Sequence, residues 1–141
     1  MFLKNLFAPP KKFNNHKVLI VDDNPLDRKL VAKTMEKMGC KVLTAVDGEI
    51  GLHLALAEKP DLILSDYDMP HMDGLTMCKE LRANQETQDI PVIFLSGSAT
   101  PGNIVDIFDV SNVDNYICKP INSKVLIHQI EDIFNKHLPK K

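Results

Sequence analysis

Four short apolar runs of the 141-residue chain each end in polar groups that could take part in chemistry. In chain order, the runs and the residues that follow them are 18–21 with Asp22 and Asp23, 62–64 with Ser65 and Asp66, 92–95 with Ser96, and 116–118 with Lys119. If the runs are neighbouring parallel strands, their carboxyl ends share one edge of a sheet, where open α/β folds bind ligands. The sequence therefore predicts three carboxylates, a hydroxyl and an ammonium at one site.

Three carboxylates at one edge would repel one another. Two like charges ~4 Å apart cost about 4 kcal/mol at an effective dielectric constant of ~20, so without compensation one of them would take up a proton. A divalent cation removes this conflict, and hard oxygen ligands favour Mg²⁺, for which Mn²⁺ could substitute. With the cation bound, one carboxylate can act as nucleophile toward phosphorus. Lys119 and Ser96 are suitable donors to the phosphoryl oxygens, so the residue types predict phosphoryl transfer.

The elements that would position these groups alternate along the chain. Nearly continuous apolar runs predict strands buried on both faces, and the stretches between them have helical periodicity. Five strands alternating with five helices predict an α/β protein with a doubly wound five-stranded parallel sheet of order 2-1-3-4-5, covered by helices as a three-layer sandwich. The first helix is expected to place on its apolar face Leu26, Leu30, Val31 and Met35.

Composition argues against several classes of protein. A formal net charge of −2 leaves no basic footprint for direct binding of nucleic acid. No apolar run approaches the ~18 residues of a membrane span. Cys40, Cys78 and Cys118 lack the spacing of a zinc site or a disulfide framework, which indicates reduced core thiols in a cytoplasmic protein.

The predicted domain organisation is a single packed unit with two short flanks. We expect an N-terminal extension over 1–15, a domain over 16–138 and a C-terminal tail over 139–141. The apolar residues near the start of the extension predict either a mobile arm or a small hook for a partner, a dimer mate or a membrane surface. No linker to a further domain is evident, which suggests a stand-alone protein or an excised domain.

Four stretches resemble, in order, the motifs of response-regulator receiver domains. They are VLIVDDN at 18–24, PDLILSD with MPHMDG over 60–74, PVIFLSG at 91–97 and YICKPI at 116–121. The match is collinear and extends over nearly all of 16–138. The resemblance implies the flavodoxin-like fold of chemotaxis receivers and a role as a phospho-accepting switch in a two-component or phosphorelay system.

The resemblance also implies roles for individual residues. Asp66 would accept the phosphoryl group and contribute to the metal site. Asp23 would be a direct Mg²⁺ ligand, and Asp22 would act mostly through water. The backbone carbonyl of Asp68 would complete the protein ligands.

Other residues would contact the phosphoryl group or respond to it. Ser96 and Lys119 would contact the phosphoryl group, and Tyr116 would change rotamer with Ser96. The bond from Lys119 to Pro120 would be cis.

Some positions depart from the common receiver pattern. Asp68 adds a carboxylate two residues after the acceptor, and we expect Asp68 and Ser98 to modulate the reaction. Gly97 replaces the more usual alanine, and Thr100-Pro101-Gly102 makes the next loop atypical. The fourth helix, expected over 100–113, could therefore be short or mobile.

By the same resemblance, phosphorylation would switch a surface made of the fourth helix, the fifth strand and the fifth helix. The phosphodonor would be a histidine kinase or a phosphotransfer protein, and the output partner is unknown. The protein would be a monomer or a phosphorylation-dependent homodimer. It would not be an enzyme, except in assisting its own phosphorylation and dephosphorylation.

Two other functions fit parts of the pattern. Asp66-Tyr67-Asp68 matches the D-x-D of haloacid-dehalogenase-like phosphatases, in which the second aspartate is a general acid/base. That family has its acidic pair last along the chain, whereas Asp22 and Asp23 come first here, and the length leaves no room for a substrate cap. The other alternative is a receiver that no longer cycles phosphate and acts as a scaffold, against which the intact acidic set, Ser96 and Lys119 argue.

Overall fold

The protein is built on one five-stranded parallel sheet. The computed structural model describes residues 13–97 and 115–137. Its strands are β1 (Lys17–Val21), β2 (Lys41–Ala45), β3 (Leu62–Asp66), β4 (Val92–Ser96) and β5 (Asn115–Cys118). Their spatial order is β2-β1-β3-β4-β5, and every neighbouring pair is parallel. The predicted fold class and strand order are confirmed.

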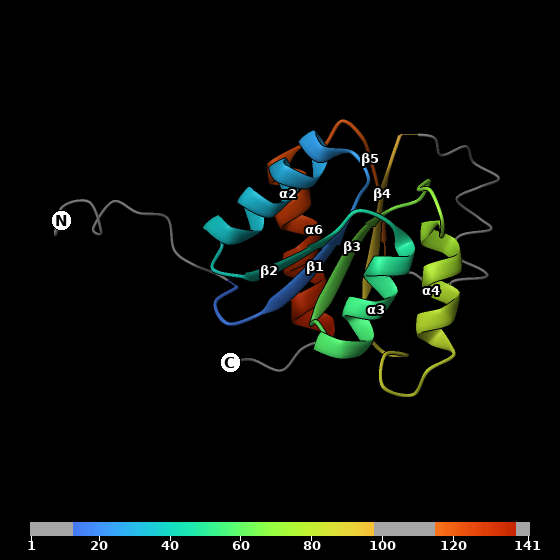
Figure 1. Cartoon of the computed structure of the whole chain (residues 1–141). Coiled ribbons are helices and arrows are strands. Elements are labelled where there is room, and N and C mark those ends of the chain that lie inside the picture. Colours follow the sequence, from blue (N-terminus) through green and yellow to red (C-terminus); the bar gives the residue numbers. More distant parts are fainter. Residues whose placement is uncertain (1–12, 98–114, 138–141) are drawn as a thin grey trace, which may run out of the picture.

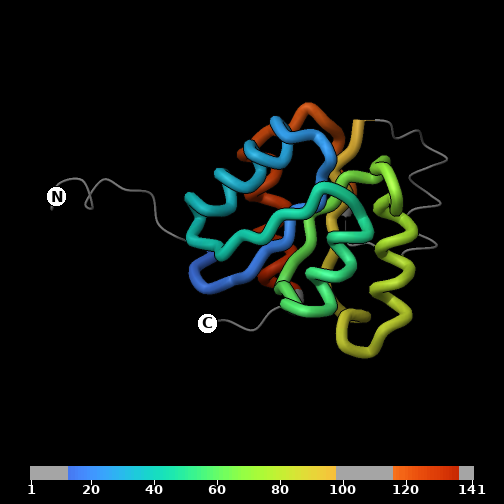
Figure 2. Tube along the Cα trace, in the orientation of Figure 1, coloured from blue at the N-terminus to red at the C-terminus, as the bar shows by residue number. Residues whose placement is uncertain are grey.

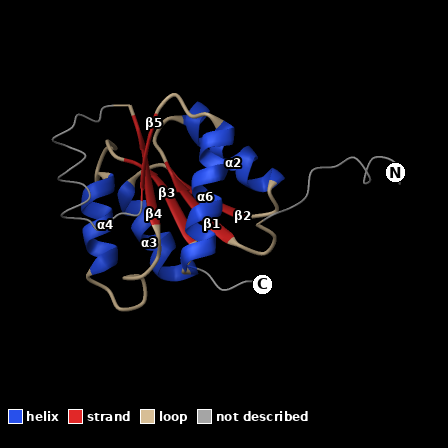
Figure 3. Cartoon of the chain, turned by 180° about the vertical axis from the view of Figure 1, so that it is seen from behind, coloured by secondary structure: helices blue, strands red, loops and turns tan. Residues whose placement is uncertain are grey.

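Helices cover both faces of the sheet, as a parallel sheet requires. The described helices are α2 (Pro25–Lys37), α3 (Gly48–Glu58), α4 (Gly74–Arg82) and α6 (Ser123–His137). The pair α2 and α6 lies on one face, and the pair α3 and α4 lies on the other (Figures 1 and 3). The expected helix over 100–113 lies outside the described residues. The three-layer arrangement follows from these two pairs.

The strands are buried on both sides because alternate side chains enter two separate cores. In β1, Val18 and Ile20 pack into the core under α2 and α6. Leu19 and Val21 pack into the core under α3 and α4. Figure 2 shows the same division in the trace, with α2 and α6 on one side of the sheet and α3 and α4 on the other. Near-continuous apolar runs in the sequence reflect this two-sided burial.

Each of the four described helices starts at the carboxyl edge of the sheet with a capping side chain. Asn24 accepts from the N–H groups of Leu26 and Asp27 at 2.9 and 3.1 Å. Asp47, Asp73 and Asn122 accept in the same way from the first turns of α3, α4 and α6. These caps satisfy backbone donors that a helix leaves unpaired, so they fix the helix starts beside the strand ends.

The predicted apolar face of α2 is partly wrong. Val31 and Met35 are buried as expected, but Leu26 is 78% exposed and Leu30 is 42% exposed. The buried stripe continues from Val31 to Met35 and Met38, a spacing of four and three residues. Leu26 precedes Val31 by five residues and is therefore turned about 140° away from it around the helix. Helical spacing alone therefore places Leu26 on the apolar face, although the packing leaves its side chain in solvent.

The amino edge of the sheet is closed by aromatic rings. Phe13 is buried, and its N–H donates to the carbonyl of Met38 at 2.9 Å. The Phe134 ring of α6 meets Phe13 edge-on at 5.0 Å between centroids and stacks on His16 at 4.3 Å. Residues 13–15, the described part of the predicted N-terminal extension, thus lead directly into the packed core.

The cysteines do not all lie in the core. Cys40 and Cys78 are buried as predicted, but Cys118 at the end of β5 is exposed, which corrects the expectation of three core thiols. Cys118 is on the last position of its strand, where the side chain leaves the packed layer. None of the helices in the described ranges is long and apolar enough to cross a membrane.

Candidate functional site

Three carboxylates meet at the carboxyl edge of the sheet. Asp22 follows β1 and Asp66 ends β3, and the two strands pair so that Val21 lies opposite Ser65. Asp22, Asp23 and Asp66 each offer an oxygen, and these oxygens all lie within 4.8 Å of one another. Asp22 and Asp66 are buried, whereas Asp23 is exposed. The strand register therefore holds two buried carboxylates and one accessible carboxylate together.

Three hydrogen bonds fix Asp22, two through its backbone and one through its side chain. Its N–H donates to the carbonyl of Ala45 at 3.0 Å, and its own carbonyl accepts from Arg28 Nη1 at 2.8 Å. The side-chain Oδ1 accepts from the N–H of Asn24 at 2.9 Å. These bonds tie the end of β1 to β2 and to the start of α2, so the Asp22 carboxylate is held in one orientation.

The Asp66 carboxylate is held in an unfavourable environment for a charge. Burial raises the pKa of Asp66 to about 6, with the Lys119 charge lowering it and the Asp22 charge raising it further. The N–H of Tyr67 donates to Asp66 Oδ1 at 2.8 Å, which favours the ionised form. The charge conflict that the sequence predicts is therefore present, and Lys119 relieves only part of it.

Lys119 reaches across the site from the loop after β5. Its Nζ lies 2.8 Å from Asp27 Oδ2, 3.0 Å from Asp22 Oδ2 and 3.4 Å from Asp66 Oδ2. Desolvation lowers the pKa of Lys119, but hydrogen bonds to Asp27 and Asp22 outweigh it and raise the pKa above its usual value. The bond to Pro120 is cis, as expected. The lysine is therefore a fixed cation among the carboxylates.

Ser96 and Tyr116 lie on the neighbouring strands β4 and β5. Ser96 is buried at the end of β4, and its carbonyl accepts from the backbone N–H of Lys119 at 3.1 Å. The hydroxyl of Tyr116 donates to the same carbonyl at 3.3 Å. Burial raises the pKa of Tyr116. The tyrosine ring is half-buried and bonded to the Ser96 backbone, so the two residues are already in contact.

Two of the predicted residues, Asp68 and Ser98, are expected to modulate the reaction. Asp68 has an exposed side chain just after β3. Ser98 lies outside the described residues. Asp27, in contrast, was missed by the sequence analysis although it contacts Lys119. Its place in the first turn of the helix that follows Asp22 and Asp23 is the signal that could have identified it.

This arrangement has the parts that phosphoryl transfer to a carboxylate needs. Asp66 Oδ2 faces the Lys119 ammonium, which can neutralise charge on a phosphoryl oxygen. Asp22, Asp23 and Asp66 together form an all-oxygen donor set, which fits a hard divalent cation such as Mg²⁺. A cation there would offset the repulsion that burial intensifies at Asp66.

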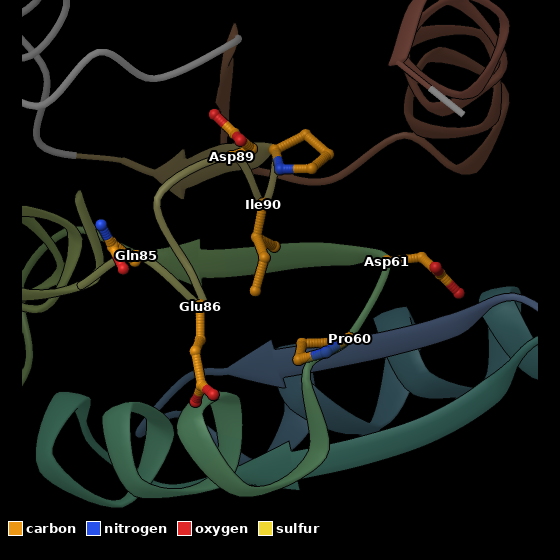
Figure 4. A pocket seen from close by; sticks show the side chains of 7 residues that line it. Pro60, Asp61, Gln85, Glu86, Asp89 and Ile90 are labelled. Atoms are coloured by element: carbon orange, nitrogen blue, oxygen red, sulfur yellow. The ribbon is translucent and has the colours of Figure 1, made fainter. Parts of the chain in front are cut away.

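A hollow at the opposite edge of the sheet does not have these properties. Its lining residues are Pro60, Asp61, Gln85, Glu86, Asp89, Ile90 and Pro91. Figure 4 shows Ile90 extending toward Pro60, whereas the carboxylates of Asp61, Glu86 and Asp89 point in different directions. Asp61 accepts from the backbone N–H of Lys17, and Glu86 pairs with Lys59. Asp61 and Glu86 thus serve local structure, and the three acids do not converge on one point.

Comparison with known sequences gives a consistent match. Residues 18–131 match the family described as response regulator receiver domain. The chain is similar to the DNA-binding dual master transcriptional regulator RpaA of Synechocystis, with 35% identity over 85% of this chain and 49% of RpaA. The chain spans about half the length of the curated relatives it matches.

Solved structures agree with this match. The chain resembles the chemotaxis response regulator CheY4 of Vibrio cholerae, with 28% identity and a TM-score of 0.79 over 85% of this chain and 99% of CheY4. It shares its fold with the receiver domain of the sensor histidine kinase PA1611 of Pseudomonas aeruginosa, at 24% identity and a TM-score of 0.79 over 86% of this chain and 98% of that domain. That structure has a magnesium ion coordinated in its active site cleft.

Proposed function

Because the chain belongs to the response-regulator receiver family, we propose that Asp66 accepts a phosphoryl group in a Mg²⁺-dependent reaction and that its phosphorylation switches a partner-binding surface. The observation that carries this proposal is the meeting of Asp22, Asp23 and Asp66 within 4.8 Å, with Lys119 Nζ 3.4 Å from Asp66 Oδ2. A structural role alone does not explain buried like charges at one edge, because such charges destabilise the fold.

The cation would be held by oxygen ligands of this chain. Asp23 and Asp66 are the direct carboxylate ligands, Asp22 acts mostly through water, and the backbone carbonyl of Asp68 completes the protein set. When bound, Mg²⁺ neutralises charge on the phosphoryl oxygens and on the crowded carboxylates. The exposed position of Asp23 supports this assignment, because it leaves one carboxylate of the set accessible to an incoming cation.

The residues around Asp66 divide the reaction between them. An oxygen of Asp66 forms the new P–O bond while the bond between phosphorus and the donor group breaks. Lys119 donates to one phosphoryl oxygen, and the Ser96 hydroxyl donates to another. Tyr67 keeps the second carboxylate oxygen of Asp66 oriented through its backbone N–H. Phosphoryl transfer depends mainly on such positioning and charge neutralisation.

Phosphorylation would change the molecule through Ser96 and Tyr116. A phosphoryl group brings strong acceptors and added charge, so it draws the Ser96 hydroxyl and the loop after β4 inward. Tyr116 then leaves the Ser96 carbonyl and fills the vacated space. This shift biases a surface formed by the helix expected over 100–113, by β5 and by α6 between two states.

The phosphodonor would be a histidine kinase or a phosphotransfer protein. The protein itself would act in the cytoplasm. The chain matches 49% of the length of the DNA-binding regulator RpaA, so the output partner of this chain is a separate question. We propose a monomer or a phosphorylation-dependent homodimer that does not itself bind nucleic acid. Asp68 modulates the lifetime of the phosphorylated state, and an unchanged lifetime in Asp68→Asn would contradict that role.

The direct test is the mass of the intact protein after incubation with acetyl phosphate or phosphoramidate, with and without Mg²⁺. We expect a gain of one phosphoryl group that requires Mg²⁺ and is absent in Asp66→Asn. No adduct and no consumption of the donor would instead favour a scaffold that no longer cycles phosphate. Steady release of phosphate from ordinary phosphate esters would favour a phosphatase.

A further inference from the structure

Lys119 has one carboxylate partner that does not belong to the predicted metal site. Asp22 and Asp66 are members of the acidic cluster that could hold a cation, together with Asp23. Asp27 is outside this cluster, yet it makes the shortest of the three contacts to Lys119, at 2.8 Å. The lysine is therefore bonded both to the cluster and to a separate group on α2.

Asp27 is well placed to act as a fixed anchor. It lies in the first turn of α2, and its N–H donates to the capping side chain of Asn24 at 3.1 Å. The next residue, Arg28, donates to the Asp22 carbonyl at 2.8 Å and ties the same turn to the end of β1. The side chains of Lys119 and Asp27 are 17% and 30% exposed, so their ion pair is only partly screened by water.

A bound cation changes the two kinds of contact differently. It would compete with Lys119 for the oxygens of Asp22 and Asp66, because these oxygens lie in the predicted metal site. The contact with Asp27 would not be affected in this way. A lysine side chain is long and flexible, and without a partner its ammonium moves freely into solvent. The site thus needs a contact that keeps the lysine in place when the cation is bound.

We propose that Asp27 is a positioning residue that holds the Lys119 ammonium at the carboxyl edge, within reach of a phosphoryl group on Asp66. The inference deepens the proposed function and, for its catalytic consequence, rests on it. The aspartate does not contact the phosphoryl group itself, and it acts through the lysine.

A purely structural role for Asp27 would have different consequences. An acidic residue in the first turn stabilises a helix through the helix dipole, whatever it contacts. Glu49 provides the matched control, because it is an exposed acid in the first turn of α3. Glu49→Ala removes the same charge from the same kind of position without touching Lys119.

The first experiment observes the lysine directly and needs no phosphorylation. In ¹⁵N-labelled protein with Mg²⁺ present, we expect the Nζ–H signal of Lys119 to be protected from exchange with water. Asp27→Ala should remove this protection, Asp27→Glu should restore part of it, and Glu49→Ala should leave it unchanged. Protection that persists in Asp27→Ala would overturn the proposal.

The second experiment measures the initial rate of phosphorylation by acetyl phosphate at saturating Mg²⁺. We expect Asp27→Ala to lower the rate about fivefold, which corresponds to about 1 kcal/mol for a partly exposed charged contact. In a Lys119→Ala background the same substitution should have no effect. An equal loss in both backgrounds would overturn the positioning role.

The two experiments separate the two proposals. If the wild-type chain takes up no phosphoryl group, the proposed function fails, and the exchange measurement alone decides whether Asp27 holds Lys119. If the wild-type chain is phosphorylated but Asp27→Ala matches Glu49→Ala in both readouts, the proposed function stands and the role of Asp27 is rejected.

Discussion

The two edges of the sheet are held by different kinds of contact. At the amino edge, Phe13, His16 and Phe134 form a cluster of rings that closes the core under α2 and α6. At the carboxyl edge, Asp22 and Asp66 are buried close together and share one ammonium. Apolar contacts stabilise the first edge, whereas the second contains charges whose burial costs free energy.

This difference separates stability from chemistry within one small domain. The strands β1 and β3 pair in parallel from Val18 opposite Leu62 to Val21 opposite Ser65, and this register places their carboxyl ends side by side. The carboxyl edge can then hold mutually repelling groups, because the rest of the fold maintains their positions. Substitutions at the amino edge should therefore change the free energy of unfolding, whereas those at the carboxyl edge should change reactivity.

The largest effect is expected for Phe134→Ala. The substitution removes the ring that contacts both Phe13 and His16 and leaves a cavity, so the free energy of unfolding should fall by about 3–4 kcal/mol. Urea denaturation measures this change, and Phe134→Leu should cost less than half as much. The rate of phosphorylation of the folded fraction should remain near that of the wild type. A large fall in this rate would contradict the separation of the two edges.

Gly74→Ala should affect both stability and reactivity. A Cβ at Gly74 would clash with the carbonyl oxygen of Asp66, so the start of α4 or the end of β3 must shift. We expect a loss of about 2 kcal/mol in the free energy of unfolding and slower phosphorylation.

Gly97→Ala is the matched control for this change at the same edge. There the nearest atom to a new Cβ is Lys119 Cβ at 3.8 Å, an ordinary contact. Its effect on both measurements should be small, and equal effects of the two substitutions would contradict the steric explanation.

Asp66→Asn should stabilise the protein when no divalent cation is present. The substitution removes one of two buried carboxylates that share Lys119, so the free energy of unfolding should rise by about 1 kcal/mol in a buffer with a chelator. Thermal unfolding measures the change. Addition of Mg²⁺ should raise the melting temperature of the wild type more than that of Asp66→Asn. If Asp66→Asn instead lowered the free energy of unfolding in the buffer with a chelator, this result would contradict the repulsion between the Asp22 and Asp66 carboxylates.

The ionisation of the Cys40 thiol, beside the amino edge, should affect stability only at alkaline pH and not near neutrality. Burial, together with the charge of Asp61, raises the pKa of Cys40 from 9.0 to about 12. The folded state thus retains a proton that the unfolded chain has released, and stability should fall as the pH rises from about 9 toward 12. Urea denaturation over this range should show a shallower fall in Cys40→Ala. Identical slopes would show that Cys40 does not contribute.

Much of the fold was predictable because each element depends on local pattern. The apolar runs predicted the strands, and the cap at Asn24 with Pro25 marks the start of α2. Leu26 shows where this reasoning failed, because periodicity alone does not say which side of a helix meets the sheet. Cys118 shows the same limit at a strand end, where burial depends on what covers the last residue.

Within the candidate site, the sequence by itself determined which groups meet. Parallel strands end at one edge, so Asp22, Asp66 and Lys119 had to approach one another once the strand order was known. Only the tertiary structure decided how the single ammonium is shared among several acids, and that Asp27 on α2 makes the shortest of these contacts. That contact depends on how a helix and a distant loop pack over the sheet, a property that no local pattern of residues specifies.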